Sequence, residues 1–190
     1  LLGCTANEAT VLIGDRQQVT RASIDATFAR KYPRHIDTLW NMYGAEAERD
    51  PAAALARFRS ENTLANMRFY TQVLRRCNAS PVYTYLFARQ VPGIDCEFYG
   101  AYHASEIPYH FGNLAAFTPD DHALSQAMMS FWRTFAKDGQ PTAPGQPHWR
   151  PYDKAADLWM HLDIPCRFAP LPSPERTDFL QALLAERTGL

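Results

Sequence analysis

Short strand-like segments separated by long helix-like ones set the strongest limit on how this chain can fold. The strand candidates are a mostly apolar run at residues 1–5, a stretch rich in β-branched and aromatic side chains at 81–87, and residues 157–162. Because helical segments alternate with them, we expect α/β layering, with a mostly parallel sheet flanked by helices. Three strands make a poor independent sheet, so we expect them to be the last members of a larger one.

The helix-like segments carry residues that begin and end helices. Thr118 precedes Pro119 and two acidic residues, which is typical of a helix start, and Gly139 supplies the stop. The stretch from Ala52 to Arg76 contains neither Gly nor Pro and predicts one helix, or two that break around residues 60–62. Further helices are predicted from residue 23 to near 33, over 36–43, and from 173 to near 189.

Charge and hydropathy exclude several classes of partner. The chain has 19 basic and 20 acidic residues and a net charge of −1, which gives no reason to expect nucleic acid or an anionic membrane. No apolar run approaches the roughly 20 residues that span a bilayer. Residues 1–4 lack the basic segment of a signal peptide, so we expect the chain to begin inside a longer protein.

The cysteines leave two alternatives open. Cys4, Cys77, Cys96 and Cys166 show no Cys-x-x-Cys spacing, and we therefore expect no metal site. A disulfide between Cys77 and Cys96 would close a modest loop around a predicted strand and would favour an extracytoplasmic location. Four buried thiols explain the same count equally well. Neither alternative establishes the cellular compartment of the protein.

The chemistry-bearing residues are a histidine and two carboxylates. His103 follows a small-residue turn, Glu106 comes three residues later, and Glu8 follows the first strand candidate, 95 positions before His103. A carboxylate that orients an imidazole stabilises the imidazolium formed when the imidazole takes a proton from a serine. No Gly-x-Ser-x-Gly occurs in the 190 residues. Two of the three groups of a serine hydrolase are therefore expected here.

Three segments carry a resemblance to a known family. They are residues 2–8 (LGCTANE), residues 100–106 (GAYHASE) with Phe111-Gly112, and residues 131–141 (FWRTFAKDGQP) with 149–152 (WRPY). Their order and approximate spacing resemble the C-terminal part of the type-B carboxylesterases. That family includes cholinesterases, bacterial para-nitrobenzyl esterases and neuroligin-like adhesion proteins.

The resemblance implies a fold and a role for each motif. Residues 1–190 would be the C-terminal portion of a single α/β-hydrolase domain, and the N-terminal part of the same protein would carry the serine. Glu8 would be the triad acid and His103 the triad base of a serine esterase that hydrolyses carboxylic esters without a cofactor or metal. The family usually has Gly where Ala9 stands, a change that would shift the turn if this position requires a positive φ.

Further residues are expected around this pair. Glu106 is predicted to brace the loop near the imidazole, although a carboxylate in a first helical turn has the same appearance. Phe98, Tyr99 and Tyr102 are candidates for lining the substrate pocket, and aromatic packing beneath a loop would give the same pattern. The resemblance also suggests that residues 36–76 supply part of a lid. The other histidines are interpreted as structural or surface residues.

Two alternatives to an enzyme remain at this stage. One is a neuroligin-like binding module of the same fold that does no chemistry. The other is an inactive fragment that folds only with its N-terminal part and would otherwise expose an apolar sheet edge. Retention of both Glu8 and His103 favours the serine esterase.

Overall fold

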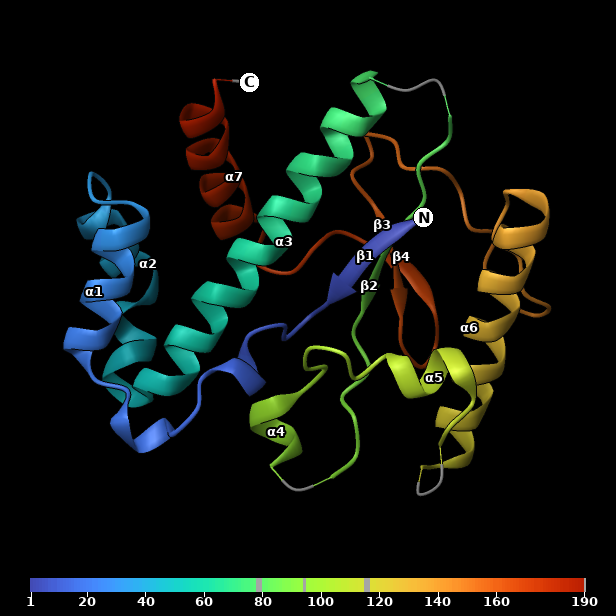
Figure 1. Ribbon diagram of the computed structural model, residues 1–190, viewed down its shortest axis with the longest axis horizontal. Helices are drawn as coiled ribbons and strands as arrows, with labels where there is room; N and C mark the ends of the chain where they lie inside the picture. Colours follow the sequence, from blue (N-terminus) through green and yellow to red (C-terminus); the bar gives the residue numbers. More distant parts are fainter. Residues whose placement is uncertain (78–79, 94, 115–116, 190) are drawn as a thin grey trace.

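The computed structural model describes residues 1–77, 80–93, 95–114 and 117–189, and it is built around a four-stranded sheet (Figure 1). The strands are β1 (Leu2–Thr5), β2 (Thr84–Phe87), β3 (Trp159–Leu162) and β4 (Arg167–Ala169), in that spatial order. β1 pairs parallel with β2 and β2 parallel with β3, whereas β4 is antiparallel to β3. The α/β class and the mostly parallel sheet predicted from the sequence are thus confirmed.

The helices account for most of the remaining chain. They are η1 (Thr10–Leu12) and η2 (Arg16–Gln18), which are short 3₁₀ helices, and α1 (Arg21–Lys31), α2 (Ile36–Arg49), α3 (Pro51–Cys77), α4 (Cys96–Tyr99), α5 (Ile107–Phe111), α6 (Pro119–Asp138) and α7 (Pro174–Thr188). Thr118 accepts a hydrogen bond from the backbone of Asp121 and caps α6, and Gly139 ends it at φ +72°, as the sequence predicts. Strand β4 and the short helices α4 and α5 were not predicted.

The sheet separates two layers of apolar side chains. On one face Cys4, Leu86 and Trp159 pack with Leu64 of α3. On the other face Phe87 and its neighbours on β3 pack against α5 and α6. Figure 1 shows the strands between the diagonal α3 and the α6 helix at the right-hand side. The period of two along β2 therefore buries alternate residues in two different cores.

A third core, which is wholly helical, lies beside the sheet. It is formed by α1, α2, α3 and α7, which stand to the left in Figure 1. The rings of Phe28 and Phe58 lie 4.8 Å apart in an edge-to-face arrangement, and the ring of Tyr43 lies 5.5 Å from that of Phe58. Leu39 and Leu180 complete this fully buried cluster. Helix α3 contributes both to this core and to the one on the sheet. One part of it covers the sheet, and along its length it packs against the other helices.

Helix α3 is continuous through residues 60–62, so the alternative of two shorter helices is wrong. Ser60 Oγ accepts a hydrogen bond of 3.0 Å from the backbone of Ala9. Glu61 accepts one of 2.5 Å from the hydroxyl of Tyr43, and Asn62 donates one of 2.6 Å to the hydroxyl of Tyr32. These tertiary partners satisfy side chains that, when exposed, compete with a helical backbone for hydrogen bonds.

The four cysteines are free thiols, so the structure contains no disulfide between Cys77 and Cys96. Cys77 ends α3 and Cys96 begins α4, and these two ends lie on opposite sides of the molecule (Figure 1). Cys4 and Cys166 are buried, as the thiol alternative predicts, but Cys77 is exposed and Cys96 is half-buried. A disulfide between these residues therefore gives no support for an extracytoplasmic location.

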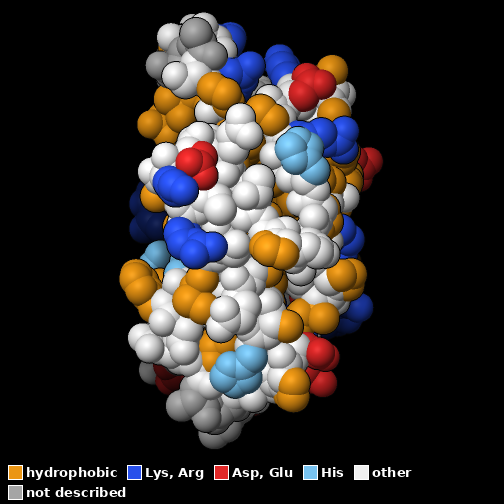
Figure 2. Space-filling model, turned by 90° about the vertical axis from the view of Figure 1, so that its right-hand side faces the viewer, with side chains coloured by type: hydrophobic (Ala, Val, Ile, Leu, Met, Phe, Trp, Pro, Cys, Tyr) orange, Lys and Arg blue, Asp and Glu red, His pale blue; other side chains and the backbone are white. Residues whose placement is uncertain are grey.

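The surface carries apolar side chains mostly as scattered residues. Figure 2 shows the face formed by α6, on which apolar, basic and polar side chains are interspersed. The large apolar side chains exposed elsewhere include Leu12 and Phe111, which come shortly after Glu8 and His103 in the chain. No helix in the described part of the chain is both long and apolar enough to cross a bilayer.

Asp121 links the segments that follow β2. Its carboxylate is fully buried and accepts hydrogen bonds from Arg89 Nε at 2.7 Å, from the Tyr109 hydroxyl at 2.8 Å and from the backbone of Thr118 at 3.0 Å. Although burial alone would raise the pKa of Asp121, these donors hold it well below its usual range. Because Tyr109 lies in α5, the cluster anchors the segment immediately after His103.

Replacing Asp121 with alanine should lower the free energy of unfolding by about 3 kcal/mol, because Arg89 and Tyr109 would lose their buried acceptor. Urea denaturation measures this change. The control is Asp120→Ala, at an exposed position in the same helical turn, which should cost less than about 1 kcal/mol. Equal losses in both variants would contradict the role assigned to the Asp121 cluster.

The same cluster predicts a pH dependence of stability. Since the pKa of Asp121 is lower in the folded than in the unfolded protein, its stabilisation is complete above the unfolded pKa of about 3.9 and is lost as the pH falls below it. Asp121→Asn should flatten this acid limb when unfolding is followed between neutral and acidic pH. If the acid limb is unchanged in this variant, the loss of stability at low pH comes from other carboxylates.

Candidate active site

The site forms where two neighbouring parallel strands end. Glu8 follows β1 and His103 follows β2, and the carboxyl ends of parallel strands meet at one edge of a sheet. The pairing continues beyond the strands: Ala6 donates to the carbonyl of Phe87 at 2.9 Å, and Asn7 donates to the carbonyl of Ala101 at 2.9 Å. A parallel bridge between Asn7 and Tyr102 then places the next residue of each segment side by side.

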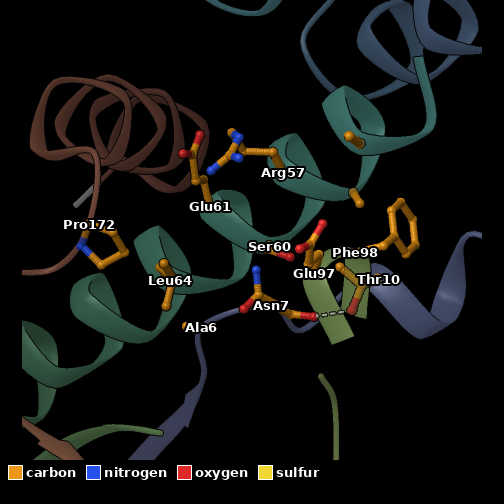
Figure 3. A pocket seen from close by; sticks show the side chains of 12 residues that line it. Ala6, Asn7, Thr10, Arg57, Ser60, Glu61, Leu64, Glu97, Phe98 and Pro172 are labelled. Carbon is orange, nitrogen blue, oxygen red and sulfur yellow. Dashed lines mark hydrogen bonds between the residues drawn. The ribbon is translucent and has the colours of Figure 1, made fainter. Parts of the chain in front are cut away.

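Asn7 also binds the second segment with its side chain. Its Oδ1 accepts a hydrogen bond of 3.0 Å from the backbone of Ala101. Gly100 leaves room for this contact, because a Cβ at that position would lie 2.3 Å from Asn7 Oδ1, and its φ of +57° favours glycine. The hydroxyl of Thr10 lies 2.9 Å from the carbonyl oxygens of both Asn7 and Tyr99, and Figure 3 draws the first of these contacts.

Glu8 and His103 meet in a short hydrogen bond. Glu8 Oε2 lies 2.6 Å from His103 Nδ1, and Glu8 Oε1 accepts a bond of 2.7 Å from the backbone of Thr5. The Glu8 side chain is 14% exposed, whereas that of His103 is 60% exposed. Within the described residues Nε2 of His103 makes no hydrogen bond. The pair therefore presents an oriented imidazole whose outer nitrogen is free to take up a proton.

Ala9 fits the turn after the acid without strain. Its φ is −99°, which any residue adopts, and its side chain is buried. Its backbone N–H donates to Ser60 of α3. The position therefore does not require glycine, and the expected shift of the turn does not occur. The contact also ties the acid loop to the long helix.

Glu106 lies at the start of α5, three residues after the imidazole. Its Oε2 is buried and has no hydrogen-bond partner within the described residues. Burial raises the pKa of Glu106 and the nearby Glu8 carboxylate adds to this effect, while its own backbone N–H and His103 act in the opposite direction. No hydrogen bond joins Glu106 to His103 here, so its predicted bracing role remains a prediction.

The three aromatic candidates do not share one pocket. Phe98 lines a cavity of about 210 Å³ together with Asn7, Thr10 and residues of α3 (Figure 3). The rings of Tyr99 and Tyr102 pack edge to face at 6.3 Å, and neither lines this cavity. Their contribution to a substrate pocket stays a prediction, whereas the alternative of aromatic packing describes the contacts that they make.

Two apolar side chains near the acid were missed from the sequence. Val11 and Leu12 lie on η1, and they are 39% and 63% exposed. The sequence signal that could have identified them is their position three and four residues after Glu8, which places them on the turn that carries this acid.

The remaining histidines lie outside the site. His110 packs on the ring of Trp132 at 4.1 Å, and burial lowers its pKa to about 4. His161 is buried in β3, with Nε2 3.0 Å from the carbonyl of Pro170. His122 and His148 are exposed, and His35 directly precedes α2. In the part of the chain that the structure describes, no three His, Cys, Asp or Glu residues are arranged to hold a metal ion.

An acid and an imidazole at the carboxyl ends of adjacent parallel strands, with the acid first in the chain, agree with the order of these groups in α/β-hydrolases. The chain belongs to the carboxylesterase family, whose model matches residues 4–180. This match covers the three motifs that carried the resemblance in the sequence, apart from residues 2 and 3, and it includes both Glu8 and His103.

Individual relatives match over shorter segments, or over a longer one at lower sequence identity. Human cocaine esterase is 32% identical over 127 residues, which are 60% of this chain and 22% of that protein. A medium-chain fatty acyl-CoA hydrolase precursor from Anas platyrhynchos is 28% identical over 178 residues, 88% of this chain and 31% of the relative. Mouse bile salt-activated lipase is 36% identical over 83 residues, 39% and 14% of the two chains. The chain thus spans less than a third of these relatives' length.

Gly100→Ala should disrupt the junction between the two segments, because the added Cβ collides with Asn7 Oδ1. We expect the free energy of unfolding to fall by about 2–3 kcal/mol, with loss of the downfield imidazole N–H resonance of His103 in NMR spectra. Gly145→Ala is the matched control. Gly145 has φ +72° with nothing within 4 Å, so its replacement should cost only the backbone strain of about 1 kcal/mol. Identical effects of the two changes would exclude a special role for the Asn7 contact.

Proposed function

We propose that this chain supplies the acid and the base of a serine carboxylic ester hydrolase that acts through an acyl-enzyme. The observation that carries the proposal is the 2.6 Å contact between Glu8 and His103 at the edge shared by β1 and β2. Membership of the carboxylesterase family supports ester hydrolysis as the reaction class. The names of the relatives, an esterase, an acyl-CoA hydrolase and a lipase, agree with it.

In the proposed mechanism a serine from outside these 190 residues attacks the ester carbonyl. Nε2 of His103 takes the serine proton, and Glu8 holds the imidazolium through Nδ1. His103 then protonates the leaving alcohol, which yields the acyl-enzyme, and afterwards accepts a proton from the water that hydrolyses it. Backbone donors outside this chain would stabilise the oxyanion.

The proposal includes the domain organisation. Residues 1–190 would form the C-terminal portion of one α/β-hydrolase domain, whose N-terminal portion carries Gly-x-Ser-x-Gly. Two observations support this. The chain matches less than a third of each of three longer relatives. In addition, β1 has a strand neighbour on one side only within the described sheet, which leaves backbone donors and acceptors for a further strand.

The proposed mechanism suggests roles for the residues that surround the pair. Val11 and Leu12 would contact an apolar acyl or alcohol group, because they are exposed on the turn that carries Glu8. Phe98 would add to this surface from α4. The partnerless Oε2 of Glu106 would bind a donor, a water or a group of the N-terminal portion, and thereby brace the loop of His103.

The neuroligin-like binding module and the inactive fragment are the rival functions. A binding module has no need of a partly buried carboxylate hydrogen-bonded to an exposed imidazole, and the Glu8–His103 geometry therefore favours the enzyme. An inactive fragment would retain the geometry without a serine. These rivals differ from the esterase in whether the reading frame contains a nucleophile that reacts.

The test is p-nitrophenyl butyrate hydrolysis and fluorophosphonate labelling by the protein expressed from its full reading frame. His103→Ala should lower kcat by about 10³-fold or more, and Glu8→Gln by a comparable factor, because the base or its orienting acceptor is lost. His122→Ala and Glu48→Gln, at exposed positions away from the pair, should leave kcat unchanged. If the full protein is neither labelled nor active on short and long acyl esters, it is not an esterase and the binding module takes precedence.

A further inference from the structure

A second pocket opens at the surface of the helical part of the molecule, and it includes no residue of the sheet or of the acid–imidazole pair. It has a volume of about 390 Å³ and lies between the C-terminal ends of α1 and α7; we call it the α1–α7 pocket. Its charged wall is formed by Lys31, Arg34 and Arg187, and its apolar wall by Tyr32 and Leu183. Tyr32 and Leu183 are buried, whereas Arg34 and Arg187 are exposed at the rim. The pocket therefore has an apolar floor and a cationic rim.

Lys31, which lines the pocket, has several cations in its electrostatic surroundings. Arg30 and Lys31 end α1, Arg59 lies on α3 and Arg187 lies at the end of α7. Burial lowers the pKa of Lys31, and the charges of Arg187, Arg59 and Arg30 lower it further. In the ranges that the structure describes, no carboxylate lies within ion-pair distance of Arg30, Lys31, Arg34, Arg59 or Arg187. Like charges are thus assembled here without a counterion from the protein.

The one carboxylate on the wall does not neutralise these cations. Glu186 is 60% exposed at its side chain, and its Oε2 faces Nε2 of His35 at 3.7 Å. The ammonium group of Lys31 is instead held by a neutral acceptor, because it donates to Asn62 Oδ1, and Asn62 in turn donates to the Tyr32 hydroxyl. This chain of hydrogen bonds fixes the ammonium group and leaves it further protons to donate.

Helix dipoles account for only part of this arrangement. Basic residues in the last turn of a helix interact favourably with its carbonyl end, by about 0.3–1 kcal/mol each. That effect explains Arg30, Lys31 and Arg187 separately. It does not explain why the Lys31 ammonium group is half-buried beside them.

We propose that the α1–α7 pocket binds a phosphate group carrying at least two negative charges, as in a phosphomonoester or a diphosphate. Arg34 and Arg187 would each offer a planar pair of donors to phosphate oxygens, and Lys31 would supply a point charge from the floor. Tyr32 and Leu183 would contact an apolar part of the ligand. The proposal does not depend on the esterase function, because none of these residues contacts Glu8 or His103.

Calorimetric titration of the full-reading-frame protein with inorganic pyrophosphate tests the proposal. We expect saturable binding at one site per chain, weakened roughly tenfold by Arg34→Gln and by Arg187→Gln. Both side chains are exposed, so these variants should fold. Arg133→Gln removes an exposed arginine from α6 and should leave the affinity unchanged. A second arm uses phosphatidylcholine vesicles with and without phosphatidic acid: binding to pyrophosphate identifies a soluble ligand, and binding to phosphatidic acid alone identifies a lipid headgroup.

Three results would overturn the proposal. They are the absence of saturable binding in both arms, an equal loss of affinity in Arg133→Gln, and an unchanged affinity in Arg187→Gln. The last result would mean that Arg187 stabilises the C-terminal end of α7 and does not bind phosphate.

Discussion

The parallel pairing of β1 with β2, and its continuation into the loops, is the contact on which the candidate site depends. The register places Thr5 beside Phe87, and the backbone bonds of Ala6 and Asn7 carry the pairing past the strand ends. Glu8 and His103 then follow at the same level. Their geometry is therefore a property of backbone hydrogen bonds rather than of the two side chains themselves.

The long helix α3 connects this junction to the helical core. Twenty-seven residues at 1.5 Å each make a rod of about 40 Å, which touches β1 and η1 as well as α2 and α7. Its Ser60 holds the acid loop at Ala9, and its Asn62, half a turn further, holds Tyr32 and Lys31 at the α1–α7 pocket. A single element thus supports both sites, and its polar residues are buried where they serve these contacts.

Local signals in the sequence were sufficient for the elements that they define. The capped ends of α6 followed from Thr118 and Gly139, and the two catalytic candidates followed from their motifs. The continuity of α3 could not be foreseen, because Ser60, Glu61 and Asn62 are stabilised by partners distant in sequence. Strand β4 was missed for a related reason: its three residues form a strand only through pairing with β3. The Asn7–Gly100 contact combines residues 93 positions apart, and no local pattern reveals it.

The wide sequence separation of Glu8 and His103 also has a consequence for folding. They are 95 positions apart, and the intervening chain includes all of α1, α2 and α3. Closing a loop of this length has an entropic cost that local helical contacts do not have, so we expect the pair to form after those helices. On this expectation, the hydrogen bond between Glu8 and His103 would report that the chain around it has reached its native topology.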